Sequence, residues 1–175
     1  PDPDALQLKQ AIATQQHVDV DNVYVGNGSD EVLAHIFKAF FVQEQPLLYA
    51  DISYSFYPVY SQLFAVNSKI LPLNDNFEIV IEDYQQPNGG IILTNPNAPT
   101  SIALGVSAIE HVLKANPDSV VVIDEAYVDF GAESAVSLVK KYQNLVVCQT
   151  TSKSRSLAGL RVGFAIAQPH LIAAL

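Results

Sequence analysis

The chain is 175 residues long, which is the length of one ordinary domain or slightly more and is enough to bury a sizeable core. Apolar residues make up 49% and charged residues 15% of the sequence, which argues against a disordered chain and against a charged helical bundle. The formal net charge of -9 argues against non-specific binding to nucleic acid or to an acidic membrane surface.

The cysteine content and the two ends of the chain bear on location and completeness. Cys148 is the single cysteine and cannot form a disulfide within the chain, so a reducing cytoplasm is the expected compartment. The sequence has neither an apolar run of about 18 residues nor an export signal, and no membrane span is expected. It contains no methionine, opens on Pro1-Asp2-Pro3-Asp4 and stops just inside a helix-like segment that begins at Pro169. We interpret it as an internal segment of a longer protein.

Short apolar runs alternate along the chain with longer amphipathic segments. In chain order, the runs that predict strands are residues 23–25, 46–50, 69–73, 90–94, 119–124, 145–150 and 161–167. The segments that predict helices are residues 4–14, 29–41, 55–64, 107–115 and 134–142, and residues 77–84 fit either state. Several of the runs are apolar on both faces, which is typical of parallel strands covered by helices on both sides. The pattern predicts a three-layer α/β/α sandwich around a mostly parallel sheet of about seven strands, with residues 1–175 in one domain.

Polar clusters follow four of the predicted strands. They are residues 26–30, 95–100, 124–127 and 150–153. In sheets of this class, ligands bind at the carboxyl ends of the strands, where the four clusters would meet. The sequence therefore predicts one functional site built from these segments.

Asp124 ends one apolar strand, where a carboxylate is costly without a partner, and Lys153 lies just past another. Asp124 could pair with a cation such as a protonated ring nitrogen, or it could cap a turn. Partial desolvation and cationic neighbours would favour the neutral, nucleophilic amine of Lys153, and the alternative is an exposed surface lysine. Tyr127 could donate its hydroxyl to a ligand oxygen, or lie at the edge of the core.

Groups that could bind an anion occur in three places. Gly28, Ser29 and Asp30 open a predicted helix, and the free N–H groups of a helix start suit a phosphate. Ser152 and Arg161 could complete this cup, because arginine binds phosphate oxygens through a planar fork. The structural alternatives are an ordinary helix start and an arginine paired with a carboxylate.

An aromatic side chain and an amide complete the set of candidates. Tyr54, in the aromatic run 53–57, could stack on a ring or serve packing alone. The turn 95–100 is fixed by two prolines and carries side-chain amides, including that of Asn97, and it could also be a plain loop. The joint order of these signals, rather than any one of them, carries the interpretation.

That order resembles the fold-type-I aminotransferases that depend on pyridoxal 5'-phosphate (PLP), over essentially the whole chain. The segments that carry the resemblance are Gly-Asn-Gly-Ser-Asp-Glu (26–31), Ser-Tyr-Ser-Phe-Tyr (53–57), Asn-Pro-Asn-Ala-Pro-Thr (95–100), Asp-Glu-Ala-Tyr (124–127) and Thr-Ser-Lys-Ser…Leu-Ala-Gly-Leu-Arg-Val-Gly-Phe (151–164). The opening Pro-Asp-Pro, together with the first and fourth of these segments, is most similar to the histidinol-phosphate branch of that family.

The resemblance implies a role for each candidate. Lys153 would form the Schiff base with PLP and move a proton, and Asp124 would pair with the pyridine nitrogen. Tyr127 would contact the phenolic oxygen of the ring, and Tyr54 would stack on the ring. Asn97 is the candidate for an amide contact with the ring oxygen. The phosphate would be held by Gly28, Ser29, Asp30, Ser152 and Arg161. No metal is expected.

Two positions depart from the family pattern. Ala98 stands where the family has an asparagine before Pro-Thr, which leaves Asn97 or Asn95 for the amide contact. Ser101 stands where a glycine usually follows Pro-Thr, which affects the geometry of the turn.

The reaction implied by the resemblance is amino transfer between L-histidinol phosphate and 2-oxoglutarate in histidine biosynthesis, in a cytoplasmic homodimer. The family's small domain would lie beyond residue 175, so this segment alone is expected to be inactive. Two alternatives keep the cofactor: an aromatic-amino-acid aminotransferase and a threonine-phosphate decarboxylase. A third, a non-catalytic α/β binding domain, predicts no imine at Lys153.

Overall fold

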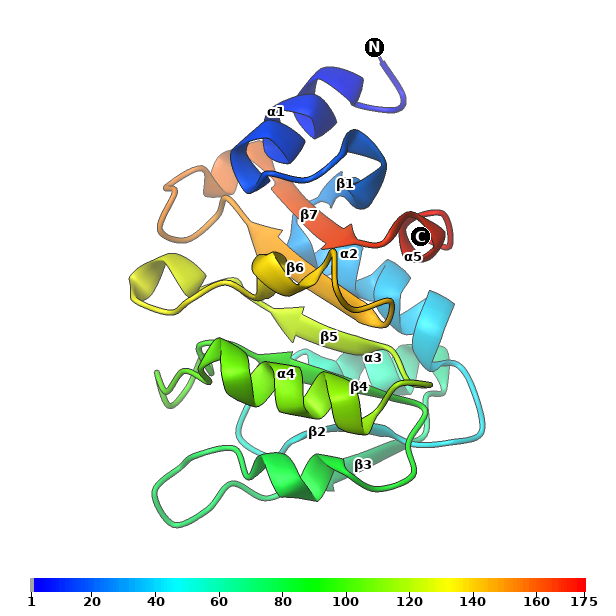
Figure 1. Ribbon diagram of the computed structural model, residues 1–175, viewed down its shortest axis with the longest axis vertical. Helices are drawn as coiled ribbons and strands as arrows, with labels where there is room; N and C mark the ends of the chain where they lie inside the picture. The colour runs from blue at the N-terminus through cyan, green and yellow to red at the C-terminus, as the bar shows by residue number, and fades with distance from the viewer. Residues whose placement is uncertain (1) are drawn as a thin grey trace.

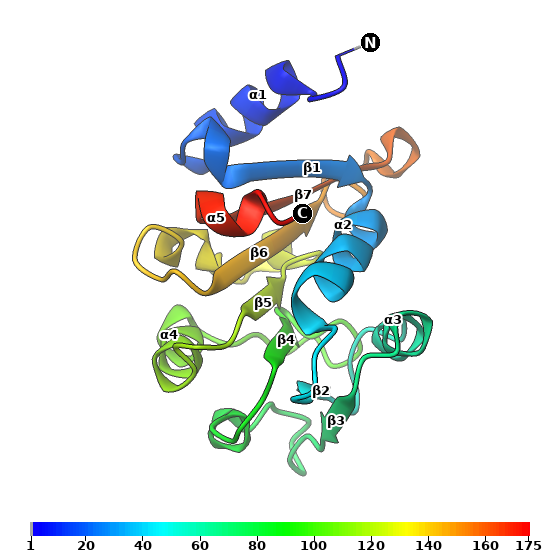
Figure 2. The same ribbon diagram turned by 90° about the vertical axis from the view of Figure 1, so that its right-hand side faces the viewer.

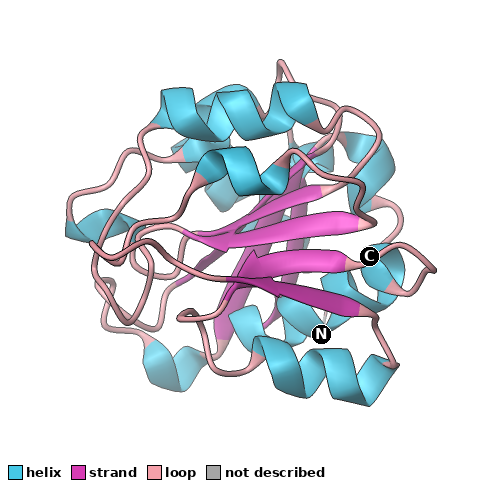
Figure 3. Ribbon diagram, turned by 90° about the horizontal axis from the view of Figure 1, so that it is seen from below, coloured by secondary structure: helices cyan, strands magenta, loops and turns pink. Residues whose placement is uncertain are grey.

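A computed structural model describes residues 2–175; Pro1, the first residue of the Pro-Asp-Pro opening, lies outside the described residues. Seven strands form one sheet, and helices lie against both of its faces (Figure 1; Figure 3). The predicted three-layer α/β/α architecture is confirmed.

All seven predicted strands are present. They are β1 (Val23–Asn27), β2 (Leu47–Ala50), β3 (Ser68–Leu71), β4 (Gly90–Thr94), β5 (Val121–Asp124), β6 (Leu145–Thr150) and β7 (Val162–Ala167). Their order in the sheet is β1-β7-β6-β5-β4-β2-β3. The pairs among β2 to β6 are parallel, whereas β7 runs antiparallel to both β6 and β1. The sheet is therefore mostly parallel, with one reversed strand.

Helices divide between the two faces of the sheet (Figure 2). One face is covered by α2 (Ser29–Ile36), its π-helical extension Phe37–Phe41, α3 (Tyr57–Phe64) and α5 (Pro169–Ile172). The other is covered by α1 (Leu6–Gln16) and α4 (Val106–Ala115). Short 3-10 turns lie at Val20–Asn22, Ile81–Tyr84, Val128–Phe130, Ala135–Leu138 and Ala158–Leu160.

The central strands are buried on both faces because their side chains alternate between two cores. In β5, Val121 and Ile123 pack toward α1 and α4, whereas Val122 packs toward α2 and α3. This arrangement explains why the strands appear in the sequence as continuous apolar runs. Within residues 2–175, no helix has the length and apolar character that a bilayer crossing requires.

The helix predicted at residues 134–142 is wrong, since only a 3-10 turn forms at Ala135–Leu138. The buried carboxylate of Glu125 fixes its start, accepting hydrogen bonds from the Ser134 hydroxyl at 2.7 Å and the Ala135 amide at 2.6 Å. Most of the turn's side chains then point into the core, and the chain enters β6 soon afterwards.

The reversal of β7 brings two parts of the chain to one end of the sheet. A parallel neighbour of β6 would require a crossover along the whole sheet, whereas an antiparallel one needs only a local loop. Residues 151–161 form this loop, which stays at the carboxyl end of β6. Both Lys153 and Arg161 therefore lie at the end of the sheet where β4 and β5 also terminate.

Candidate active site

A cavity opens at the carboxyl ends of the parallel strands, where the four predicted polar segments meet. Its lining comprises Ser29, Asp30, Leu33, Tyr54, Thr94, Ala98, Asp124, Ala126, Tyr127, Thr150, Ser152, Lys153 and Arg161. Eight of the ten residues predicted for the site belong to this lining, and the exceptions are Gly28 and Asn97. Segments that are far apart in the sequence thus line one cavity.

Asp124 is a carboxylate buried at the end of the central strand β5. Only 3% of the residue is exposed. Its Oδ1 accepts a hydrogen bond from the Ala126 amide at 3.2 Å, and its Oδ2 accepts one from the Tyr57 hydroxyl at 2.8 Å. Burial raises the pKa of Asp124 to about 6, although both hydrogen bonds oppose the shift. The carboxylate would therefore gain from a cationic partner.

Tyr57 is a partner of Asp124 that the sequence interpretation missed. It begins α3 and is fully buried, with its hydroxyl also 3.3 Å from Thr94 Oγ1. Burial, reinforced by the Asp124 charge, raises the pKa of Tyr57 well above its ordinary value, so the hydroxyl keeps the proton that it donates. A signal existed: Tyr57 and Tyr60 are spaced for one helix face, and that face is buried.

The start of α2 forms a tight cradle beside Arg161. Gly28 has φ of +85°, and a Cβ placed there would lie 2.4 Å from Arg161 Nη2. A Cβ at Gly163 in β7 would lie 2.2 Å from the Ser29 amide nitrogen. Only glycines permit this close approach, which leaves the N–H groups of the helix start available to an anion. Gly28 thus shapes the cup without lining the cavity.

Asp30 contacts both Arg161, beside the cradle, and the aromatic side chain of Tyr54. Its carboxylate lies 3.5 Å from Arg161 Nη2 and accepts a hydrogen bond from the Tyr54 hydroxyl at 2.9 Å. Tyr54 meets the Tyr57 ring edge-on, with centroids 5.6 Å apart. These contacts hold the half-buried Tyr54 ring at the side of the cavity, where it could pack on a planar ligand.

Lys153 lines the cavity from the loop that follows β6. Its Nζ is 5.3 Å from the centroid of the Tyr127 ring. The sequence predicted partial desolvation of this lysine, but the residue is exposed. Lys153 is exposed because its loop extends past the end of the sheet, where residues 156–161 are also exposed. Ser152 lies between Lys153 and the strand, and its Oγ accepts a hydrogen bond from Thr150 Oγ1 at 3.0 Å.

Asn97 is not brought into the cavity lining. Its amide nitrogen donates to the carbonyl of Ile52 at 2.8 Å, while its Oδ1 is buried without a protein partner among the described residues. Asn95 binds both backbone groups of Leu104 and so fixes the loop. Ala98 lines the cavity at this turn, so the structure does not favour either asparagine for a contact there.

Known proteins resemble this chain over its whole length. The family model for aminotransferase class I and II matches residues 1–175. A histidinol-phosphate aminotransferase from Acinetobacter baylyi is 78% identical over all 175 residues, which is 48% of that protein. The chain therefore spans about half the length of the curated relatives it matches.

Two solved structures share the fold over almost the whole chain. The histidinol-phosphate aminotransferase of Clostridium acetobutylicum is 26% identical, with a TM-score of 0.86, and the match covers 99% of this chain and 53% of that one. The L-threonine-O-3-phosphate decarboxylase of Porphyromonas gingivalis is 28% identical, with a TM-score of 0.85 and the same coverage. The chain thus shares its fold with about half of each of these two enzymes.

Replacing Asp124 with Asn should stabilise the ligand-free protein at neutral and higher pH. The raised pKa means that the contribution of Asp124 to stability is complete below its unfolded value of 3.8 and is lost as the pH rises through about 6. In denaturant unfolding near pH 8, Asp124→Asn should exceed wild type by roughly 1–3 kcal/mol, with the difference vanishing near pH 4. Asp75→Asn, at an exposed aspartate, is the control. An Asp124→Asn protein that is less stable at every pH would contradict the expectation.

Replacing Tyr57 with Phe should have the opposite effect. The variant leaves the Asp124 carboxylate buried with one donor fewer, which should lower the free energy of unfolding by roughly 1–3 kcal/mol near pH 8 and by less near pH 4. Tyr60→Phe is the matched control, because the Tyr60 hydroxyl donates to the neutral Asp30 carbonyl at 2.9 Å. The loss should shrink when Asp124→Asn is also present. Equal pH dependence in both tyrosine variants would show that the hydroxyl does not act through Asp124.

Proposed function

Because the chain belongs to the aminotransferase class I and II family, we propose that it forms the cofactor-binding part of an enzyme that uses PLP to transfer an amino group. The observation that carries the proposal is one cavity that joins a buried carboxylate, a lysine and an anion cradle. A small domain beyond residue 175 remains a prediction.

The residues present fit PLP in three respects. Asp124 is a buried carboxylate contacted by a hydroxyl and an amide, so a protonated ring nitrogen would be a suitable cationic partner. Ser29, Ser152 and Arg161 line the part of the cavity beside the cradle and would hold the phosphate. Tyr54 offers an aromatic face for the ring.

When bound, PLP supplies the electron sink that accepts the electron pair of the broken substrate bond. Lys153 would hold the cofactor covalently, and its amine would then take a proton from the substrate and return it to the product. Asp124 would keep the ring nitrogen protonated through its negative charge. Tyr127 would donate its hydroxyl to the phenolic oxygen, and Tyr54 would cover the ring and exclude water.

Histidinol phosphate is the amino donor that we propose, with 2-oxoglutarate as the acceptor. Support comes from the 78% identity to the Acinetobacter baylyi enzyme over the whole chain. Decarboxylation of threonine phosphate is the second candidate, favoured by the 28% identity to the Porphyromonas gingivalis decarboxylase. The anion cradle is assigned to the phosphate of PLP, which both reactions would use, so it does not separate the two donors.

We also propose that the complete enzyme is a cytoplasmic homodimer. Large apolar side chains next to cavity-lining residues remain exposed. Phe56 and Phe130, 43% and 66% exposed, have rings 6.2 and 6.1 Å from those of Tyr54 and Tyr127, and Leu160, 65% exposed, precedes Arg161. Exposed apolar groups gathered near a site favour a protein partner, and a second copy is the usual partner of an enzyme. The paired site would then be completed across a two-fold axis.

Replacing Lys153 with Ala in the full-length protein should abolish covalent capture of PLP. Borohydride treatment of wild type should fix the cofactor mass on the peptide that contains Lys153, as measured by mass spectrometry. Transamination should fall roughly 1,000-fold or more in Lys153→Ala, because the covalent link and the proton carrier are both lost. Lys140→Ala, at an exposed lysine outside the cavity, is the control. Substantial activity in Lys153→Ala would overturn the proposed function.

A panel of amino donors should identify the substrate of the full-length protein. We expect kcat/KM for L-histidinol phosphate to exceed that for phenylalanine or tyrosine by roughly 100-fold or more, because a substrate site of the full-length protein that binds the donor's phosphate, separate from the cradle for PLP, would be left unpaired by a donor that lacks one. Threonine phosphate should release no carbon dioxide. Release of carbon dioxide at a comparable rate would instead favour the decarboxylase.

A further inference from the structure

The loop that carries Lys153 has mainly local support from its own backbone. Within it, the Leu157 amide bonds the Thr151 carbonyl at 2.9 Å and the Ser156 amide bonds the Lys153 carbonyl at 3.0 Å. Ser156 adopts a positive φ of 55°, which is unfavourable for a residue other than glycine. An exposed loop of this kind needs contacts with other elements to keep one conformation.

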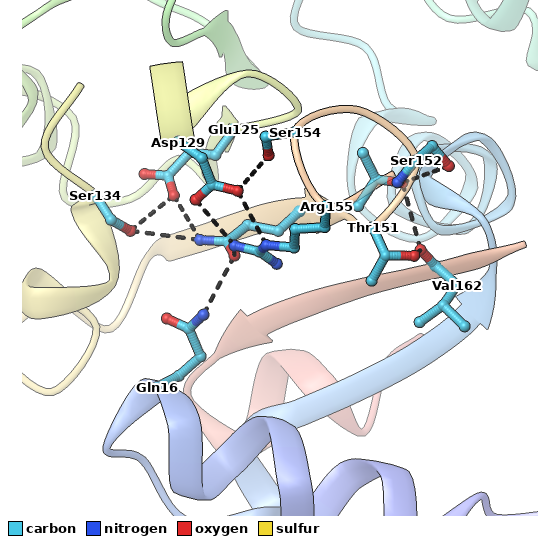
Figure 4. A network of polar contacts seen from close by, with 11 residues as sticks. Gln16, Glu125, Asp129, Ser134, Thr151, Ser152, Ser154, Arg155 and Val162 are labelled. Carbon is cyan, nitrogen blue, oxygen red and sulfur yellow. Dashed lines mark hydrogen bonds and ion pairs between the residues drawn. The ribbon is translucent and has the colours of Figure 1, made fainter. Parts of the chain in front are cut away.

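Arg155 provides such a contact two residues after Lys153 (Figure 4). Its Nε and Nη2 donate to the two carboxylate oxygens of Asp129, at 3.0 and 3.2 Å. The neighbouring Ser154 hydroxyl donates to the same carboxylate. These bonds hold the pKa of Asp129 below its ordinary value, with the Ser154 bond contributing most. A two-pronged guanidinium contact fixes orientation as well as distance, which a lysine could not do.

The Arg155 guanidinium is also bonded to a network of buried polar side chains. Arg155 Nη2 also donates to Gln149 Oε1 at 3.0 Å, and Gln149 Nε2 donates to Glu125 Oε2 at 2.8 Å. Glu125 is 1% exposed and also accepts the bonds from Ser134 and Ala135 described above. A buried network whose members all have partners is rigid, so Arg155 is anchored to the sheet rather than to another mobile loop.

This network joins two segments that line the proposed site, the one after β5 and the loop of Lys153. Glu125 and Asp129 belong to the segment that follows β5 and also carries Asp124 and Tyr127. Arg155 belongs to the loop of Lys153 and crosses to that segment. We propose that Arg155 is a positioning residue, whose fork on Asp129 sets the place of the Lys153 amine relative to Asp124 and Tyr127. The inference rests on the proposed function, because it assigns Arg155 a role in the same reaction.

The contact is better suited to positioning than to overall stability. The side chains of Arg155 and Asp129 are 30% and 38% exposed, and partly exposed ion pairs contribute little to the free energy of unfolding. Misplacement of a reacting group by about 1 Å, in contrast, can slow a reaction roughly 100-fold. Loss of the fork should therefore appear in the reactivity of Lys153 and hardly at all in the unfolding transition.

The test uses the full-length protein and the variant Arg155→Lys, which keeps the charge and loses the fork. PLP is added to cofactor-free protein, samples are reduced with borohydride at timed intervals, and the mass fixed on Lys153 is followed. We expect the rate of covalent capture to fall roughly tenfold or more, with little change in the thermal midpoint. Asp129→Asn should act in the same direction. Lys114→Gln, which breaks an exposed pair with Glu110 on α4 (3.3 Å), should leave the rate unchanged.

A second measurement separates positioning from general damage. In a Lys153→Ala background, the equilibrium affinity for PLP should be the same with and without Arg155→Lys, within about twofold, because Arg155 would act only through Lys153. A loss of affinity in that background, or an unchanged rate of capture in Arg155→Lys, would overturn the inference. Absence of any capture by the wild-type protein would instead overturn the proposed function.

Discussion

The burial of the Asp124 carboxylate is the constraint on which the candidate site depends. The residue ends β5, between β4 and β6, where water cannot reach most of it. A charge in such a place is costly unless its surroundings supply donors or an opposite charge. The Tyr57 hydroxyl and the Ala126 amide supply two donors, so α3 must pack against the sheet closely enough to bring Tyr57 beneath the cavity.

The reversed strand β7 imposes a second constraint that follows from the first. Because Asp124 lies at the carboxyl end of a central strand, a reacting amine must reach the same end. The antiparallel turn from β6 into β7 achieves this within one loop, which begins near Lys153 and ends at Arg161. The same strand brings Gly163 against the start of α2, so one connection positions the lysine and closes the anion cradle.

Much of the fold could be predicted from the sequence, because strands buried on both faces are continuous apolar runs with polar residues at one end. The site followed in outline, since four polar segments had to meet there. Side-chain directions could not be predicted. The bond from Tyr57 to Asp124 joins residues 67 positions apart, and the bond from Asn97 to the Ile52 carbonyl joins residues 45 positions apart. The helix predicted at 134–142 failed for the same reason, because Glu125 determines its start from outside the segment.

The polar contacts of Asp124 differ from those of Glu125 and Gln149 in the number of hydrogen bonds that each carboxylate receives. Asp124 is held with too few donors to offset its burial, which is why its pKa rises to about 6 and why its ionised form weakens the ligand-free fold at neutral pH. Glu125 and Gln149 are bonded more fully and give a rigid base to Arg155. A cation placed beside Asp124 would recover the energy lost there, so binding and folding are linked at this residue. Burial raises the pKa of Glu125 as well, against its three hydrogen bonds. Of the two carboxylates, however, Asp124 is the one that lines the cavity, where a ligand can offset the cost, while the loop bearing the amine is tied to Gln149 and Glu125 without any ligand.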